Sequence, residues 1–97
     1  MRPSEALAGN EERVRKLVEE FGYKNPLVYG STARGEDGEQ SDLDILVEPA
    51  KDGLTIFDRL ELQGRLEILL KVPVDVKTDG WIADRGMRKV RAEGKPL

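Results

Sequence analysis

The sequence predicts an α/β (α+β) protein with a small mixed β-sheet and helices packed on one face of it. Two observations carry this prediction. Segments with the 3.6-residue period of amphipathic helices alternate along the chain with short apolar segments, some of which have the two-residue period of strands. The 97 residues have room for one sheet and a few helices, so we expect a single domain over residues 1–97.

The composition excludes several kinds of chemistry. The chain has no Cys and no His, which excludes disulfides, thiol nucleophiles, imidazole ligands and Ser-His-Asp catalysis. Any catalysis must therefore use carboxylates, Lys, Arg, hydroxyls or a hard metal ion. With 38% hydrophobic and 36% charged residues, and with neither a membrane span nor a signal peptide visible, we expect a cytoplasmic protein that does not enter a membrane.

The first half of the chain is predicted to hold one helix and two strands. A helix is expected over residues 11–21, where positions 14, 17, 18 and 21 are apolar, with Asn10 as its N-cap. A short strand is expected over residues 27–29, after Pro26. We expect a short helix in the turn that follows Gly30, and a second strand over residues 42–48.

The second half is predicted to hold a helix, a strand and a helix. Thr55 and Asp58 have the spacing of a capping box, which marks the start of a leucine-rich helix. Residues 74–77 alternate strictly between apolar and polar, as in a strand buried on one face. A last helix is expected from Gly80 to about Glu93.

The C-terminal segment is basic although the chain as a whole has a net charge of −3. The structural interpretation is a solvated helix face. The functional interpretations are a docking surface for an acidic partner or for RNA. The basic residues are Arg85, Arg88, Lys89, Arg91 and Lys95, against Glu93 alone.

Three aspartates are expected to converge on one face of the sheet. Asp42 and Asp44 are two residues apart in a strand, so their side chains share a face, while Leu43 and its apolar neighbours take the other. The same alternation turns Asp75 outward. Convergent carboxylates repel one another unless a cation compensates, and oxygen ligands without His or Cys select a hard ion such as Mg²⁺.

The turn that begins at Gly30 is the second half of the candidate site. Gly30 removes the side chain that would block a phosphate, and Ser31 adds a hydroxyl donor. If a short helix begins here, its free N–H groups also point toward the anion. Arg34 is placed either to reach a phosphate or to reinforce the turn. Each feature alone is common in proteins, but chance is a poor explanation of both at this fixed spacing.

At these residues the chain resembles the minimal nucleotidyltransferases of the DNA polymerase β superfamily. The motifs that carry the resemblance are Gly30-Ser31-x-Ala33-Arg34-Gly35, Ser41-Asp42-x-Asp44-Ile45-Leu46-Val47 and Val74-Asp75-Val76. The resemblance implies a polymerase β-like fold in which Gly30 and Ser31 hold a nucleoside triphosphate. It further implies that Asp42 and Asp44 bind Mg²⁺ and that Asp75 completes the metal site and helps to deprotonate the acceptor.

The family's stand-alone members are antitoxins paired with helical HEPN ribonucleases. The resemblance therefore implies transfer of AMP from ATP to a tyrosine of a HEPN toxin. Two alternatives remain open: a binding module that neutralises its partner by occlusion, and a small-molecule enzyme similar to those that modify aminoglycosides. We expect a protein partner or self-association to cover the exposed surface, and no direct binding of nucleic acid.

Overall fold

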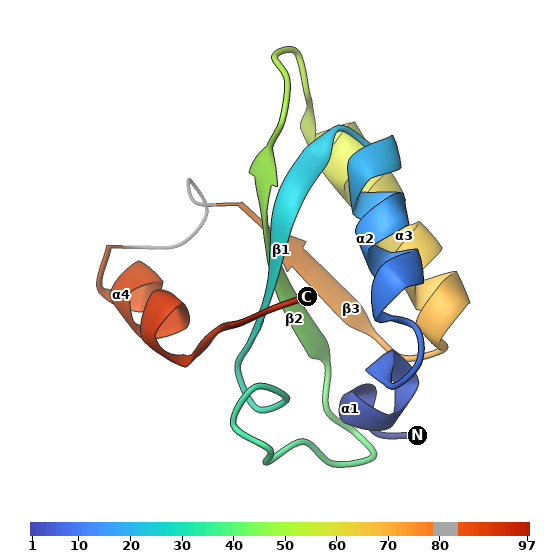
Figure 1. Ribbon diagram of the computed structural model, residues 1–97, viewed down its shortest axis with the longest axis vertical. Helices are drawn as coiled ribbons and strands as arrows, with labels where there is room; N and C mark the ends of the chain where they lie inside the picture. The colour runs from blue at the N-terminus through green and yellow to red at the C-terminus, as the bar shows by residue number, and fades with distance from the viewer. Residues whose placement is uncertain (79–83) are drawn as a thin grey trace.

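The computed structural model describes residues 1–78 and 84–97, and its strands form one mixed sheet (Figure 1). The strand order is β3-β2-β1-β4. β2 runs antiparallel to β1 and parallel to β3, and β4 pairs antiparallel with β1. This arrangement confirms the predicted fold class. The strands are β1 (Tyr23–Tyr29), β2 (Leu43–Pro49), β3 (Val74–Lys77) and β4 (Lys95–Pro96).

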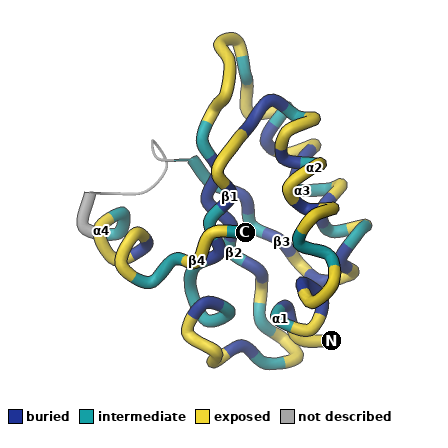
Figure 2. Tube along the Cα trace, in the orientation of Figure 1, coloured by how far each residue is buried: buried dark blue, intermediate teal, exposed yellow. Residues whose placement is uncertain are grey.

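Three helices cover one face of this sheet: α1 (Pro3–Leu7), α2 (Glu11–Glu20) and α3 (Ile56–Leu70). The core lies between them and the strands, where Figure 2 shows buried segments of the tube facing one another. Burial of each large aliphatic side chain contributes about 1.5–3 kcal/mol. The fully buried members include Val14 and Val18 of α2, Leu43, Ile45 and Val47 of β2, and Leu62 and Leu66 of α3.

The predicted capping box at the start of α3 is confirmed. The Asp58 carboxylate accepts a hydrogen bond of 2.7 Å from the Thr55 backbone N–H, and the Thr55 hydroxyl accepts one from the Phe57 N–H. Asn10 is the N-cap residue of α2, but its side-chain amide donates to the Ala6 carbonyl at 2.9 Å and makes no cap bond.

Two expectations for the first half of the chain are wrong. The segment after Gly30 is a turn and not a short helix, closed by bonds from the Arg34 N–H to the Gly30 carbonyl and from the Glu36 N–H to the Ser31 carbonyl. Strand β1 begins at Tyr23, and Pro26 lies inside it. The register with β2 is irregular there, which is where a strand tolerates proline.

Helix α4 (Asp84–Glu93) lies across the sheet from α2 and α3 (Figure 1). The expectation of helices on one face thus holds for α1 to α3, whereas α4 flanks the other face. The predicted start of this last helix, at residues 80–83, lies outside the described residues. Within the described ranges, no helix is long and apolar enough to cross a membrane.

Candidate active site

Three side chains form a row across neighbouring strands on the α4 side of the sheet. Asp44 is the register partner of Tyr29 in the antiparallel ladder and of Asp75 in the parallel ladder. Register partners share a face, and adjacent strands lie about 4.8 Å apart. The structure therefore brings Asp44 and Asp75 together as the alternation predicted. Asp42 lies exposed just before β2 begins.

The row is electrostatically strained at Asp44. Burial raises the pKa of this carboxyl above its ordinary value, and the charge of Asp75 raises it further. Lys77 opposes this shift, and its ammonium lies 3.4 Å from the Asp75 carboxylate. Asp42 adds a smaller upward contribution. The pair of carboxylates is thus held together at a cost that a further cation would relieve.

Tyr29 supplies a polar atom that the sequence interpretation missed. Burial, followed by the charges of Asp44 and Asp75, raises the pKa of its phenol to about 12. Its buried hydroxyl has no hydrogen-bond partner in the described part of the chain. Such a group is expensive to leave unpaired, so it stays neutral and available to donate a hydrogen bond.

The Gly30 turn lies directly against this row. A Cβ placed on Gly30 would be 2.6 Å from Oδ2 of Asp44, and Gly30 has a φ of +74°, in the left-handed region that favours glycine. Glycine is therefore favoured here by the backbone conformation, and any side chain would displace the Asp44 carboxylate. The predicted adjacency of turn and acidic strand is present.

The turn offers unused backbone donors. The backbone N–H groups of Ser31, Thr32 and Ala33 donate no hydrogen bond to any described residue. The next three N–H groups all donate hydrogen bonds within the turn. The Thr32 hydroxyl is likewise buried without a partner in that part of the chain. Consecutive free N–H groups in a turn form a concave site for an anion even without a helix.

Arg34 reinforces the turn in this structure. Its guanidinium donates to Glu36 at 3.0 Å and to Glu93 of α4 at 3.1 Å. The sequence left two roles open for Arg34, contact with a phosphate and reinforcement of the turn, and this geometry corresponds to reinforcement. The contact with Glu93 also ties α4 to the turn, a connection that no local pattern could reveal.

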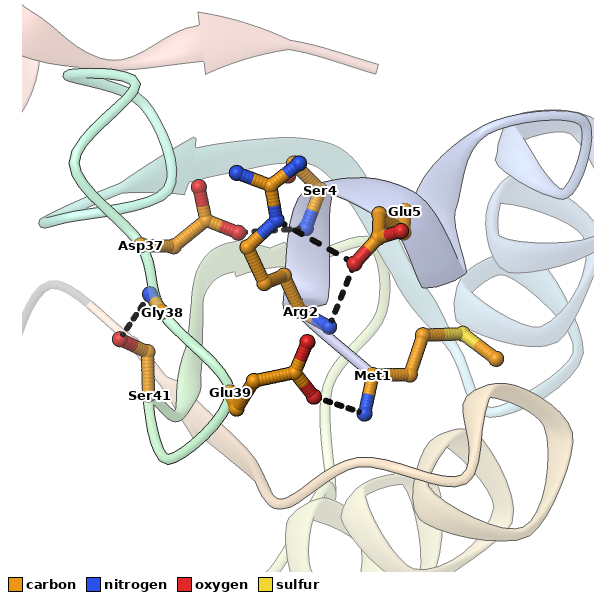
Figure 3. Close-up of polar contacts among 8 residues, drawn as sticks. All are labelled: Met1, Arg2, Ser4, Glu5, Asp37, Gly38, Glu39 and Ser41. Carbon is orange, nitrogen blue, oxygen red and sulfur yellow. Dashed lines mark hydrogen bonds and ion pairs between the residues drawn. The ribbon is translucent and has the colours of Figure 1, made fainter.

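The loop between the turn and β2 is fixed to the N-terminal segment, as Figure 3 shows. The buried carboxylate of Asp37 accepts a 2.8 Å hydrogen bond from the Ser4 backbone N–H, and this bond lowers the pKa of Asp37. Ser41 closes the loop by accepting from the Gly38 N–H at 2.9 Å. The backbone that leads into Asp42 is thus held at several points.

A pocket of about 260 Å³ opens between the turn and α4. Pockets of similar volume occur elsewhere on the surface, and this one differs from them in having two lysine side chains in its lining. Lys77 and Lys89 both line it, and Lys77 could have been found from the sequence because it is two residues beyond Asp75 on the same face. The full lining is Tyr29, Gly30, Arg34, Lys77, Gly86, Lys89, Val90 and Glu93.

No group of three or more acidic side chains in the described ranges is arranged so that it could hold a metal ion. Asp44 and Asp75 do form a pair, and Mg²⁺ is usually bound by only one or two carboxylates together with substrate phosphates. The donor set therefore suits an ion that arrives with a triphosphate better than an ion in a closed protein cage.

The comparisons with known proteins agree with this geometry. The sequence profile of the nucleotidyltransferase domain matches residues 11–96. A relative from Methanocaldococcus jannaschii, named for protein adenylyltransferase activity, is 41% identical over 70 residues, covering 70% of this chain and 78% of that protein. The solved structure of a minimal nucleotidyltransferase has a TM-score of 0.86 and 39% identity, covering 97% of this chain and 95% of that one.

A more distant structure contains a partner. It is the complex of a tri-AMPylated HEPN toxin from Shewanella oneidensis with its MNT antitoxin, matched at a TM-score of 0.70 and 25% identity over 92% of this chain and 69% of that chain. The chain described here belongs to the nucleotidyltransferase domain family. Its fold is that of the minimal members, and it is an enzyme of the nucleotidyltransferase class.

Proposed function

We propose that this protein transfers AMP from ATP to a hydroxyl group of a partner protein. The observation that supports this most is the contact between the Gly30 turn and Asp44, beside the Asp44–Asp75 pair. A phosphate-binding turn and a pair of carboxylates are needed together only when a polyphosphate and its cation bind at one place. The matched relatives supply the type of reaction.

Mg²⁺ is the proposed cofactor, held by Asp44 and Asp75 together with the substrate phosphates. Asp42, whose charge acts on Asp44, would join them as a ligand when the ion binds. The raised pKa of Asp44 supports this, because a bound cation would relieve the repulsion that raises it. When bound, Mg²⁺ would neutralise developing negative charge and orient the phosphates. Lys77, now paired with Asp75, would then be free to turn toward the phosphates.

The residues of the chain have distinct tasks in the proposed transfer. The free N–H groups after Gly30 and the Ser31 hydroxyl bind the triphosphate. The acceptor oxygen forms a bond to the α-phosphorus as the bond to pyrophosphate breaks, and Asp75 takes the acceptor's proton. Positioning and charge neutralisation supply most of the catalysis, as in other phosphoryl and nucleotidyl transfers.

The proposed acceptor is a tyrosine of a HEPN-type toxin, which makes this protein its antitoxin. The support is the matched complex, in which the HEPN toxin carries AMP groups. An ATP-dependent reaction on such a partner would take place in the cytoplasm.

The test is transfer of labelled AMP to a cognate HEPN protein in the presence of Mg²⁺. The wild-type chain should label the partner, and Asp44→Asn or Asp75→Asn should lower the rate by at least about 100-fold. Asp52→Asn, in an exposed loop, is the matched control and should keep full activity.

Two results would contradict the proposal. One is the absence of labelling with a partner shown to bind. The other is full protection of cells by the Asp44→Asn chain, which would indicate neutralisation by occlusion.

A further inference from the structure

The large apolar side chains that remain exposed in the described part of the chain are concentrated on α3. Apart from Met1, they are Phe57 at 77% exposed, Ile68 at 75%, Leu60 at 45% and Ile56 at 44%. Single exposed apolar residues need no explanation, but four on one helix form a patch. Figure 2 shows that exposed residues recur along this helix.

The exposed residues form a continuous stripe. Phe57, Leu60, Gly64 and Ile68 are separated by three or four residues, so they lie above one another on one side of the helix over about 16 Å. Leu62, Leu66 and Leu70 point the other way and are buried in the core. A surface helix normally has one apolar face, whereas α3 has two.

Gly64 lies at the centre of the stripe and has no local role in the chain. Its φ is not in the left-handed region, and apart from its chain neighbours and the helix's own backbone no heavy atom of the described residues lies within 4 Å of the place a Cβ would occupy. Glycine lowers helix propensity at such a position. A residue without a side chain here leaves room for the backbone of another helix to approach closely.

We propose that this stripe binds a second copy of the chain, with the two α3 helices antiparallel and Gly64 on the two-fold axis. In an isologous interface of this kind, residues at equal distances on either side of the axis meet. Leu60 then lies opposite Ile68 of the partner subunit, and Ile68 lies opposite Leu60 of the partner subunit. The apolar stripe is therefore complementary to itself.

The charged rim is also self-complementary. Glu61 and Arg65 are exposed on the same edge of the stripe, and neither has an ion-pair partner among the described residues. A two-fold axis at Gly64 places the same edge of both helices on the same side of the dimer, and the two edges run in opposite directions. Glu61 then lies beside Arg65 of the partner subunit, and the pair forms twice.

This interface would leave the active site open. The outer side of α3 faces away from the sheet, whereas the Asp44–Asp75 row lies on the opposite face of the sheet, toward α4 (Figure 1). The inference therefore does not depend on the proposed function. A contact made by one helix is small, so we expect a dimer that dissociates at roughly micromolar concentration.

Sedimentation equilibrium of the wild-type chain over a range of concentrations tests the proposal. The wild type should show a monomer–dimer equilibrium, and Ile68→Glu should weaken association at least tenfold while leaving the circular dichroism spectrum unchanged, because Ile68 is exposed. Lys16→Glu, on the exposed side of α2, is the control and should leave the dimer intact. A wild-type chain that stays monomeric throughout, or a dimer insensitive to Ile68→Glu, overturns the proposal.

Charge reversal tests the predicted register. Glu61→Arg and Arg65→Glu should each weaken self-association, because each places like charges together across the axis. An equimolar mixture of the two variants should form a heterodimer, because every rim pair in it has opposite charges. Failure of this mixture to associate more strongly than either variant alone overturns the antiparallel arrangement.

Discussion

At the scale of single residues, the site depends on a carboxylate held where its charge is unfavourable. Asp44 is partly buried beside Asp75, and no hydrogen bond from the described residues compensates it. Groups held in this way often mark functional sites, because the environment that strains them favours a ligand of opposite charge. The raised pKa of Asp44 thus has consequences for both stability and binding.

We predict that Asp44→Asn stabilises the fold at neutral pH although it removes activity. Because the pKa of Asp44 is raised in the folded state, its charged form lowers the free energy of unfolding at pH values above that pKa. The substitution should raise that free energy by about 0.2–1 kcal/mol at pH 7. The gain should disappear below a pH of about 3.9, where the carboxyl is protonated in both states.

Urea denaturation of both chains from pH 7 down to pH 3.5 measures this difference. Asp52→Asn, in an exposed loop, is the control for an Asp-to-Asn substitution away from the site. An Asp44→Asn chain that is less stable than the wild type at pH 7 would contradict the electrostatic interpretation.

At the scale of elements, the turn after β1 lies directly against the acidic strand and forms the candidate phosphate site. Gly30 and Gly35 have nearly the same positive φ, +74° and +73°. They differ in surroundings: a Cβ on Gly30 would press on the Asp44 carboxylate, whereas one on Gly35 would meet nothing within 4 Å. Comparing substitutions at the two glycines therefore distinguishes the effect of backbone strain from the effect of displacing the Asp44 carboxylate.

We predict that Gly30→Ala and Gly35→Ala destabilise the chain by similar amounts but differ in activity. Each substitution should cost about 1–2 kcal/mol for a side chain at positive φ. Only Gly30→Ala should also lower the rate of AMP transfer, by at least tenfold, because Asp44 must move. Thermal unfolding and the labelling assay measure the two effects separately, and equal activity of the two variants would show that the contact is unimportant.

Elements with a strong local signal could be predicted from the sequence, and elements set by tertiary contacts could not. The Thr55 capping box and the alternation around Asp75 are local, so α3 and β3 were predicted closely. Strand β4 is only two residues long and forms by pairing with β1, so it has no period to detect. Helix α1 has five residues, and Ala6 and Leu7 in the core account for its position.

The same distinction applies to the site. The shared face of Asp44 and Asp75 follows from strand alternation, and the closeness of Gly30 follows from the chain reversal that pairs β1 with β2. The contact from Arg34 to Glu93 joins residues 59 positions apart and could only be found in three dimensions. The partnerless hydroxyl of Tyr29 likewise depends on burial, which a sequence does not give.

At the scale of the whole molecule, we assign different tasks to two surfaces on opposite sides of the sheet. The side toward α4 holds the carboxylates, the Gly30 turn and the lysine-lined pocket. The outer side of α3 holds the apolar stripe that we assign to self-association. This separation would allow the proposed dimer to present two open active sites to the proposed protein acceptor.

The most direct measurement is calorimetric titration of a non-hydrolysable ATP analogue into the isolated chain, with Mg²⁺ and with EDTA. We predict binding that requires Mg²⁺ and that Asp75→Asn weakens at least tenfold, because the carboxylates contribute through the cation. Asp52→Asn should bind like the wild type. Binding that is equal with and without Mg²⁺, or that is unchanged by Asp75→Asn, would contradict a metal–triphosphate site at the Asp44–Asp75 pair.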